Sequence, residues 1–467
     1  MFKNDIIARE LKMITMEHIE TIKRNQVDAP SYFKMLDIFE GNLVKYVEHS
    51  MSQELSAESF KVASTRIPGI NILRRIVKKL SNVYSDVPKR SVVDLQDQEI
   101  VDELTQTLEL QNKMSNGEDI LNLNKCFAIE PFIEEGLMQI RILSPHEFTV
   151  LSDDINNPLK VTHFVKYMGS EQVEDSPNRF HTAAIYWIYT KDEFIIVNSD
   201  GKILKVDQNP YGEIPIIYVN ASSNFLIPSP DIDSSANAIL IPKLLADLNY
   251  ATQFQSHSIM YGVDLEIQKA SGAPDSFWNL SSREGERSSP QVGVLSPSVD
   301  TEKVLALISF TISQWLESRG VKAGTVGKAD STASGISKIV DESNTSQVVQ
   351  ENRLILKHAE ARLWKLLSNI HNRLVGSEHY TAVRGLSEDL EVSISFPEQK
   401  PIVDPIEKRN DLKFKLDNRL ISRKAALKQA NPDLSDDQLE ALQVEIDAES
   451  KVQELKVQES KVQALKV

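Results

Sequence analysis

A glycine-rich, basic stretch at residues 319–338 contains the residue types with the clearest chemical potential. Within it, the segment GTVGKAD at 324–330 has the glycine–lysine pair by which a Walker A loop holds phosphates. That motif also needs a glycine five positions before the pair and a hydroxyl residue directly after it. Lys322 and Ala329 occupy those two positions. The stretch therefore lacks the early tight turn and the magnesium ligand, and we do not expect ATP binding.

Other catalytic patterns are missing from the sequence as well. The nine histidines form no HExxH pair, and His358 and His371 are too far apart to act together on one helical face, so we expect surface or packing roles for them. No GxSxG nucleophile elbow occurs. Cys126 is the only cysteine, which excludes an intrachain disulfide and a thiolate metal cage. These observations predict no catalytic residue, no metal, no cofactor and no enzyme activity.

The basic stretch at 319–338 still has an unusual composition: four glycines, four basic residues and one acid, Asp330. Two interpretations stay open. In the first it is a flexible surface loop, where glycine gives freedom and lysine gives solubility. In the second it touches a polyanion through weak, salt-screened phosphate contacts that read no sequence.

Two helices are expected around this stretch and must position it. Pro242 suits the first turn of a helix that ends near Tyr261, with Gly262 as its stop. A second helix of similar length is expected after Asp300, a good N-cap, and ends at Gly320. Each would be about 30 Å long. Because strand and loop patterns lie between them, we expect a two-helix stalk with a small module at its far end.

The remaining elements follow from hydrophobic periodicity. Residues 1–125 read as mostly helical, and the period changes to two from Met138 to Asn220, which predicts one sequential antiparallel meander. Ile336 to Leu374 lacks glycine and proline and predicts a helix of about 60 Å. A strand is expected at Leu390–Phe396, and a polar helical region with a ten-residue repeat ends the chain.

Charge and hydropathy restrict how the chain can bind nucleic acid and in which compartment we expect it. The formal net charge is −15, whereas proteins that grip nucleic acid tightly carry a basic surplus. Any DNA contact must therefore be local and weak. A helix at Ile67–Arg90 with Arg74, Arg75, Lys78 and Lys79 on its polar face is read first as a solvated face and second as a DNA patch. No apolar run is long enough to span a membrane, and no secretory signal is seen, which predicts a reducing, cytoplasmic setting.

In this order the parts resemble the portal proteins of tailed bacteriophages, particularly the siphovirus-like portal family. NPYGEIPIIYV at 209–219 is similar to the family's N-x-x-G-x-I-P-hydrophobic strand ahead of the first stem helix. STASGISK at 331–338 matches its Ser-Gly element at the start of the long helix. Residues 416–440 resemble its late G-[LI]-[IV]-S-[KR]-x-x-[AT]-L stretch and acidic helix, with Arg419 in place of the glycine. The resemblance covers roughly Ile67 to Ala448.

The resemblance implies an α+β portal fold and a division of the chain into seven parts. These would be an N-terminal region and a wing of helices plus antiparallel sheet at 1–235, stem helix 1 at 236–262, a small α/β clip at 263–299, stem helix 2 at 300–320, a tunnel loop at 321–337, a long crossing helix with a wing return strand at 338–400, and a helical crown with the repeat tail at 401–467.

The resemblance also implies a function without enzymatic activity. The chain would form a dodecameric ring at one vertex of the virion, assembled in the host cytoplasm and without membrane contact. Double-stranded DNA would pass through it during packaging and ejection. Its partners would be the terminase large subunit, the head–tail adaptor, and the major capsid and scaffolding proteins. Another oligomeric virion or adaptor protein is the first alternative, and a nucleic-acid-processing enzyme with a cryptic site is the second.

Two sets of residues carry this implied function. The DNA channel would be lined by tunnel-loop residues and the start of the long helix: Lys322, Gly324, Gly327, Lys328 and Lys338. Partner binding would fall to aromatic and arginine residues of the clip, types that anchor interfaces: Phe277, Trp278, Arg283 and Arg287. For this second set, local packing within a small module remains an equal alternative.

Overall fold

The computed structural model describes residues 14–176, 179–256, 259–263, 277–280, 291–295, 300–321, 335–382, 384–397, 412–416 and 421–430. The chain forms two compact units, Met1–Pro397 and Glu398–Val467. Helices and mainly antiparallel sheets make up the described residues, which confirms the predicted α+β class.

The N-terminal part is helical, as predicted. Its helices are α2 (Met16–Gln26), α3 (Ala29–Glu40), α4 (Leu43–Glu54), α5 (Ala57–Ala63), the short 3-10 turn Ser64–Arg66, and α6 (Ile72–Leu80). Side chains cap several of them: Thr15 accepts the backbone N–H of His18, and Asn71 accepts that of Arg74. In α6 the predicted apolar row is buried and the four basic residues are exposed, which confirms its amphipathic orientation.

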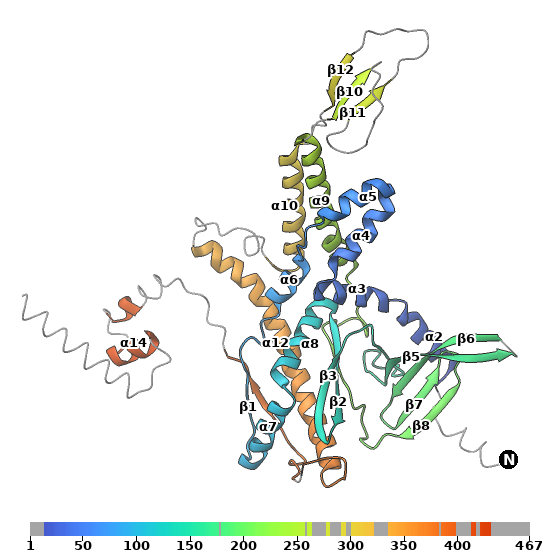
Figure 1. The fold of residues 1–467 in the computed structure, drawn as a ribbon. Helices are drawn as coiled ribbons and strands as arrows, with labels where there is room; N and C mark the ends of the chain where they lie inside the picture. The colour runs from blue at the N-terminus through green and yellow to red at the C-terminus, as the bar shows by residue number, and fades with distance from the viewer. Residues whose placement is uncertain are drawn as a thin grey trace, which may run out of the picture. The chain divides into compact units, whose positions relative to one another are not determined.

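The central part of the first unit, here called the body, is built around the long helix α12 (Gly335–Leu374) (Figure 1). Its other elements are β1 (Lys89–Ser91), α7 (Leu95–Thr107), α8 (Leu110–Asn124), β2 (Cys126–Glu134), β3 (Leu137–Leu143), β9 (Ile217–Asn220) and β13 (Ser393–Ser395). The helix matches the prediction for Ile336–Leu374. Glycine is required at Gly117 in α8, because an added Cβ would lie 2.7 Å from the ring of Phe127 in β2.

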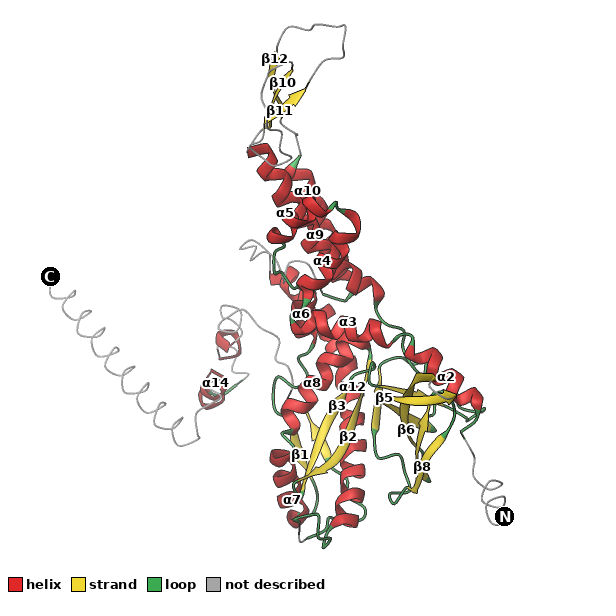
Figure 2. Cartoon of the chain, turned by 45° about the vertical axis from the view of Figure 1, so that its right-hand side comes forward, coloured by secondary structure: helices red, strands yellow, loops and turns green. Residues whose placement is uncertain are grey.

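A second sheet lies beside the body. Its strands are β4 (Phe148–Leu151), β5 (His163–Ser176), β6 (Arg179–Tyr189), β7 (Glu193–Asn198) and β8 (Ile203–Gln208). They pair antiparallel in sequence order, as predicted for this stretch. Helix α2 packs across this sheet through Ile19 and Ile22, which are both buried (Figure 2).

The prediction of one meander from Met138 to Asn220 is wrong. Its first and last strands, β3 and β9, belong to a separate three-stranded sheet, where each pairs antiparallel with β2. Strand β2 was not predicted, yet it begins with five consecutive buried residues. A strand buried on both faces has a continuous apolar run in place of alternation. When β2 is not recognised in the sequence, the only strands left to pair with β3 and β9 are those of the meander.

The stalk consists of helices α9 (Ile232–Ser256) and α10 (Thr301–Ser318). Asp300 caps α10 by accepting the backbone N–H of Lys303, as predicted. Pro242, however, lies inside α9 and does not begin it. The helix starts ten residues earlier because the Asp231 carboxylate accepts the N–H of Ser234 at 2.9 Å. Proline removes only one helical hydrogen bond, and here its buried ring adds packing.

Between the stalk helices the described residues form β10 (Ile259–Val263), β11 (Phe277–Leu280) and β12 (Gln291–Leu295). Strand β10 pairs parallel with β11 and antiparallel with β12. Tyr261 and Gly262, predicted to end the first stalk helix, are therefore strand residues. In the second unit, residues 412–416 and α14 (Arg423–Ala430) are helical, in agreement with the predicted helical end region.

Candidate functional site

The two stalk helices run antiparallel and pack along a shared apolar seam. The N-terminal turn of α9 meets the C-terminal turn of α10, since Ser234 contacts both Trp315 and Arg319. The two helices lie side by side in both Figure 1 and Figure 2. The seam is formed by Ile241, Leu244, Leu245, Ala246, Val304, Ile308, Ile312, Trp315 and Leu316. Because the strands β10–β12 are inserted between α9 and α10, they are connected to the end opposite this contact.

The base of the stalk is held by a buried polar cluster. Ser234 Oγ accepts the indole N–H of Trp315 at 3.1 Å and two N–H groups of Arg319, from Nε at 3.0 Å and from Nη2 at 2.7 Å. Arg319 also forms an ion pair with Asp231. Burial lowers the pKa of the Arg319 guanidinium, and the nearby Asp231 carboxylate opposes that shift. The cluster locks both helices together at the point where the chain enters the predicted tunnel loop.

Helix α10 ends in a Schellman motif that directs the chain into that loop. Gly320 has a positive φ of 70°, which glycine adopts without strain. Val321 donates its N–H to the carbonyl of Leu316 at 2.9 Å, and Gly320 donates to that of Glu317 at 3.0 Å. An added Cβ at Gly320 would lie 3.0 Å from Val348 of α12. The end of α10 therefore abuts the long helix.

A groove of about 930 Å³ opens beside this base. Its walls come from α8, α9, α10, α12 and the segment 221–234. Hydrogen bonds join two of these helices across the wall, because Asn352 Nδ2 donates to Asn122 Oδ1 at 2.7 Å. The lining is mostly serine, asparagine and aspartate, and it includes no described pairing of nucleophile and base.

One side of the stalk has no cover from the described residues. Three large apolar side chains of α10 are exposed: Leu305 at 48%, Leu307 at 54% and Phe310 at 61%. Leu307 and Phe310, three residues apart, share a side of α10 that differs from the side of the buried Ile308 and Trp315. Leu305 lies at a different angle around the helix. Such surface on a helix is typical of a protein–protein contact.

Most residues predicted to carry function lie where the structure gives no side-chain account. Lys322, Gly324, Gly327 and Lys328 fall outside the described residues, as do Arg283 and Arg287. Lys338 lies in the first turn of α12, and Phe277 and Trp278 lie in β11 opposite Met260 and Tyr261 of β10. Their predicted roles therefore stay predictions.

The histidines of α12 have the surface and packing roles that the sequence indicated. His358 is exposed. His371 is buried, with Nδ1 2.6 Å from the Tyr380 hydroxyl and Nε2 2.8 Å from the carbonyl oxygen of Arg384. Neither lies in a group of ligand-type residues among the described part of the chain.

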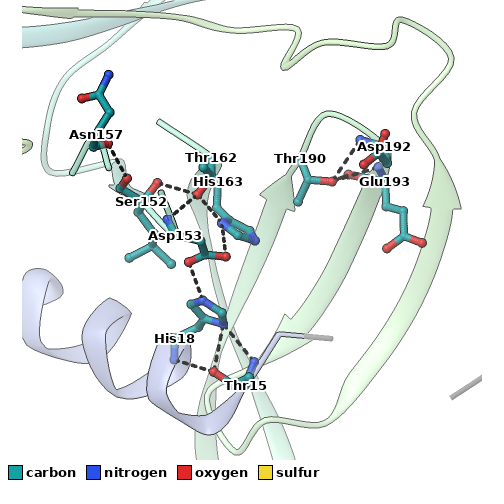
Figure 3. Close-up of polar contacts among 11 residues, drawn as sticks. Thr15, His18, Ser152, Asp153, Asn157, Thr162, His163, Thr190, Asp192 and Glu193 are labelled. Atoms are coloured by element: carbon teal, nitrogen blue, oxygen red, sulfur yellow. Dashed lines mark hydrogen bonds and ion pairs between the residues drawn. The ribbon is translucent and has the colours of Figure 1, made fainter. Parts of the chain in front are cut away.

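A group that could hold a metal lies elsewhere, at the contact of α2 with the five-stranded sheet. His18, Asp153 and His163 present ligand atoms within 4.8 Å of one another (Figure 3). Sequence reasoning missed this group because 135 residues separate His18 from Asp153, and no spacing rule covers that separation. Only the pairing of α2 with this sheet reveals it.

No described helix is both long and apolar enough to span a membrane. No protein-family model matches the chain, and no curated protein matches it. Among solved structures it is similar to a chain from the neck of an empty GTA (gene transfer agent) particle with C6 symmetry. The two are 12% identical, with 79% of this chain and 92% of that chain covered and a TM-score of 0.38. A likeness at that TM-score carries no argument for fold or function.

Proposed function

We propose that this chain is the portal subunit of a tailed-phage head, a ring-forming protein through whose channel DNA is packaged and ejected. The order of its sequence motifs supports this proposal. The described residues supply matching parts: a body of helices and sheet, an antiparallel two-helix stalk, a three-stranded sheet inserted in that stalk, and a helix of 40 residues. No enzymatic step is part of this function.

The exposed apolar side of the stalk is the observation that carries the proposal. Leu307 and Phe310, which share one side of α10, cost free energy while they face water. A second copy beside the first would cover them, and the same contact repeated by rotation closes into a ring. A dodecamer is the ring size that the family resemblance implies. The polar groove at the base of the stalk offers a further surface for the neighbouring subunit.

The charge distribution supports a channel that does not hold DNA firmly. The net charge of −15 disfavours firm binding of phosphates, and in this proposal contact is left to a few basic residues. We assign this contact first to Lys322 and Lys328 of the tunnel loop and then to Lys338, at the start of the long helix. Weak contacts of this kind are screened by salt, so DNA can slide past them.

The clip provides the docking region for other proteins. We assign Phe277, Trp278, Arg283 and Arg287 to contacts with the terminase large subunit during packaging and with the head–tail adaptor afterwards. Aromatic and arginine side chains dominate such interfaces. Capsid and scaffolding proteins would contact the body from outside. In this proposal the chain is assembled in the host cytoplasm and ends in the virion.

Electron microscopy of the purified full-length chain tests the ring. We expect winged rings with a central opening for the wild type. Phe310→Asp adds a charge to the proposed contact and should give monomers. Ile155→Asp places the same charge on a side chain that is 95% exposed and should leave rings intact. Sheets, closed shells or persistent monomers of the wild type would instead favour another virion or adaptor protein, and nucleotide hydrolysis would favour an enzyme.

A second experiment tests the DNA channel. Lys322→Ala combined with Lys328→Ala should leave rings intact and alter DNA packaging or retention. Lys160→Ala combined with Lys202→Ala removes the same charge from exposed positions beside the five-stranded sheet and should change neither. Loss of rings in the first double variant would show that the loop is structural.

A further inference from the structure

Two histidines and an aspartate converge where helix α2 meets the five-stranded sheet. His18 lies in the first turn of α2, Asp153 follows β4, and His163 begins β5. Figure 3 shows the Asp153 carboxylate between the two imidazole rings. His18 Nε2 lies 2.9 Å from Asp153 Oδ1, and His163 Nδ1 lies 3.7 Å from Asp153 Oδ2. Ligands around a tetrahedral Zn²⁺ ion lie on the order of 3.3 Å apart, given metal–ligand bonds of about 2.0–2.1 Å. The observed spacing brackets that value.

Two threonines hold these side chains in place. Thr15 Oγ1 lies 3.0 Å from His18 Nδ1. Thr162 Oγ1 lies 2.9 Å from His163 Nδ1 and accepts the backbone N–H of Asp153 at 3.0 Å. His163 is buried and His18 is half-buried. In metal sites such a bond is made by the ring nitrogen that does not bind the ion, which is the arrangement of Thr15 at His18. At His163, Thr162 instead contacts Nδ1, the nitrogen that faces Asp153.

We propose that His18, Asp153 and His163 bind one divalent transition-metal ion, with Zn²⁺ as the best fit. Two imidazoles and one carboxylate supply three ligands, which leaves a fourth position for water. Asp154 does not fill that position, since it pairs with Lys160 at 3.2 Å and accepts the backbone N–H of Asn156 at 3.0 Å. The ion would bind the N-terminal helix α2 to the β4–β5 connection.

Binding requires that His163 Nδ1 gives up its contact with Thr162 Oγ1, and it requires a change of tautomer at His18. The backbone N–H of Thr15 now donates to His18 Nδ1 at 3.0 Å, so the ring proton lies on Nε2 and points to Asp153. Coordination at Nε2 moves this proton to Nδ1, where Thr15 Oγ1 accepts it. The Thr15 N–H is exposed and can turn to water.

Calorimetric titration of the chelator-treated full-length chain with ZnCl₂ tests this site, together with thermal unfolding in the presence and absence of Zn²⁺. We expect one ion per chain and a higher unfolding temperature with Zn²⁺. His18→Ala and His163→Ala should each weaken binding by at least about tenfold, because losing a ligand costs no less than losing a supporting residue. Asp153→Asn keeps the side-chain shape and should weaken binding as well, which covers the case where an alanine variant does not fold.

His181→Ala is the matched control. His181 also pairs with an aspartate of the same sheet region, Asp200, at 2.8 Å. Both side chains are exposed (42% and 40%), and no third ligand-type residue joins them within the described part of the chain. This variant should bind Zn²⁺ as the wild type does. The proposal is wrong if the wild type binds no better than the double variant His18→Ala/His163→Ala, or if His181→Ala loses as much affinity as the site variants.

Discussion

The body around α12 and the stalk of α9 and α10 differ in how much of their apolar surface they bury within the chain. In the body, α12 buries Leu356, Leu363 and Trp364 completely, and its buried Glu360 is paired within the chain. In the stalk, α10 buries only one side and leaves Phe310 exposed. Leu354 of α12 is exposed as well, so the difference is one of degree. The body buries most of its apolar residues against its own elements, whereas α10 buries only Ile308, Trp315 and Leu316.

The largest effect on stability is expected in the body. Arg90 Nε lies 2.5 Å from Glu360 Oε1, with side chains 4% and 0% exposed. Arg90→Met leaves that carboxylate buried without its cation, which should lower the free energy of unfolding by about 3–5 kcal/mol. Urea denaturation measures it. Lys205→Met breaks an exposed pair with Asp207 and should cost under about 1 kcal/mol. If both variants lose the same unfolding free energy, the Arg90–Glu360 pair is no better shielded from water than the exposed Lys205–Asp207 pair.

The free energy of unfolding should also depend on pH through a buried carboxyl group of the body, Glu118 of α8. Glu118 is buried while it accepts the N–H groups of Val83 and Tyr84, and burial raises its pKa to about 7. In the unfolded chain its pKa is ordinary, so between about pH 4.5 and pH 7 the folded form holds a proton that the unfolded form has lost. Stability from this group is therefore present at low pH and decreases by roughly 3 kcal/mol as pH rises through that window.

Unfolding of the wild type and of Glu118→Gln measured across this pH range checks the expectation. The glutamine carries no titrating proton, so its stability should lose this slope while keeping one acceptor for the backbone N–H groups. Parallel pH profiles for the two proteins would show that Glu118 titrates normally.

The base of the stalk should be of intermediate importance. Ser234→Ala removes the acceptor of Trp315 and Arg319 and leaves buried donors unpaired, which should cost about 1–3 kcal/mol. Ser52→Ala on the exposed side of α4 serves as the control and should change stability by less than about 0.5 kcal/mol. If Ser234→Ala leaves the unfolding free energy unchanged, water must replace the serine hydroxyl, and the base of the stalk is then accessible to solvent.

The smallest effect on the chain itself is expected on the free side of the stalk. Leu307→Ser should alter the unfolding free energy of the monomer by no more than about 0.5 kcal/mol, because the side chain is already exposed. Sedimentation should nevertheless show weaker self-association than the wild type. If the variant instead destabilises the monomer and leaves association unchanged, the distinction between body and stalk fails.

The parts that sequence reasoning predicted are those with strong local signals. The cap at Asp300, the uninterrupted helix Gly335–Leu374 and the alternation in β4–β8 all act within a few residues. The misplaced start of α9 shows the limit of such signals. Proline at the first turn is common, but the carboxylate of Asp231 supplied a stronger start ten residues earlier.

The parts that were missed depend on contacts distant in sequence. Strand β2 has no alternation because both of its faces are covered, so its pairing with β9 had no local signature. The cluster of His18, Asp153 and His163 exists only because α2 packs on a sheet formed more than a hundred residues later. Ser234 and Arg319 likewise meet across 85 residues.

The pairing of β2 with both β3 and β9 has a consequence for how the chain can change over evolutionary time. Leu143 and Tyr218 both pair with Ala128, from opposite sides, so the two ends of the intervening segment lie about 10 Å apart. The five-stranded sheet is thus an insertion between two positions that lie on either side of β2 in the three-stranded sheet. Such an insertion can change in length or sequence while β3, β2 and β9 keep their register. Relatives should therefore diverge most in residues 144–216.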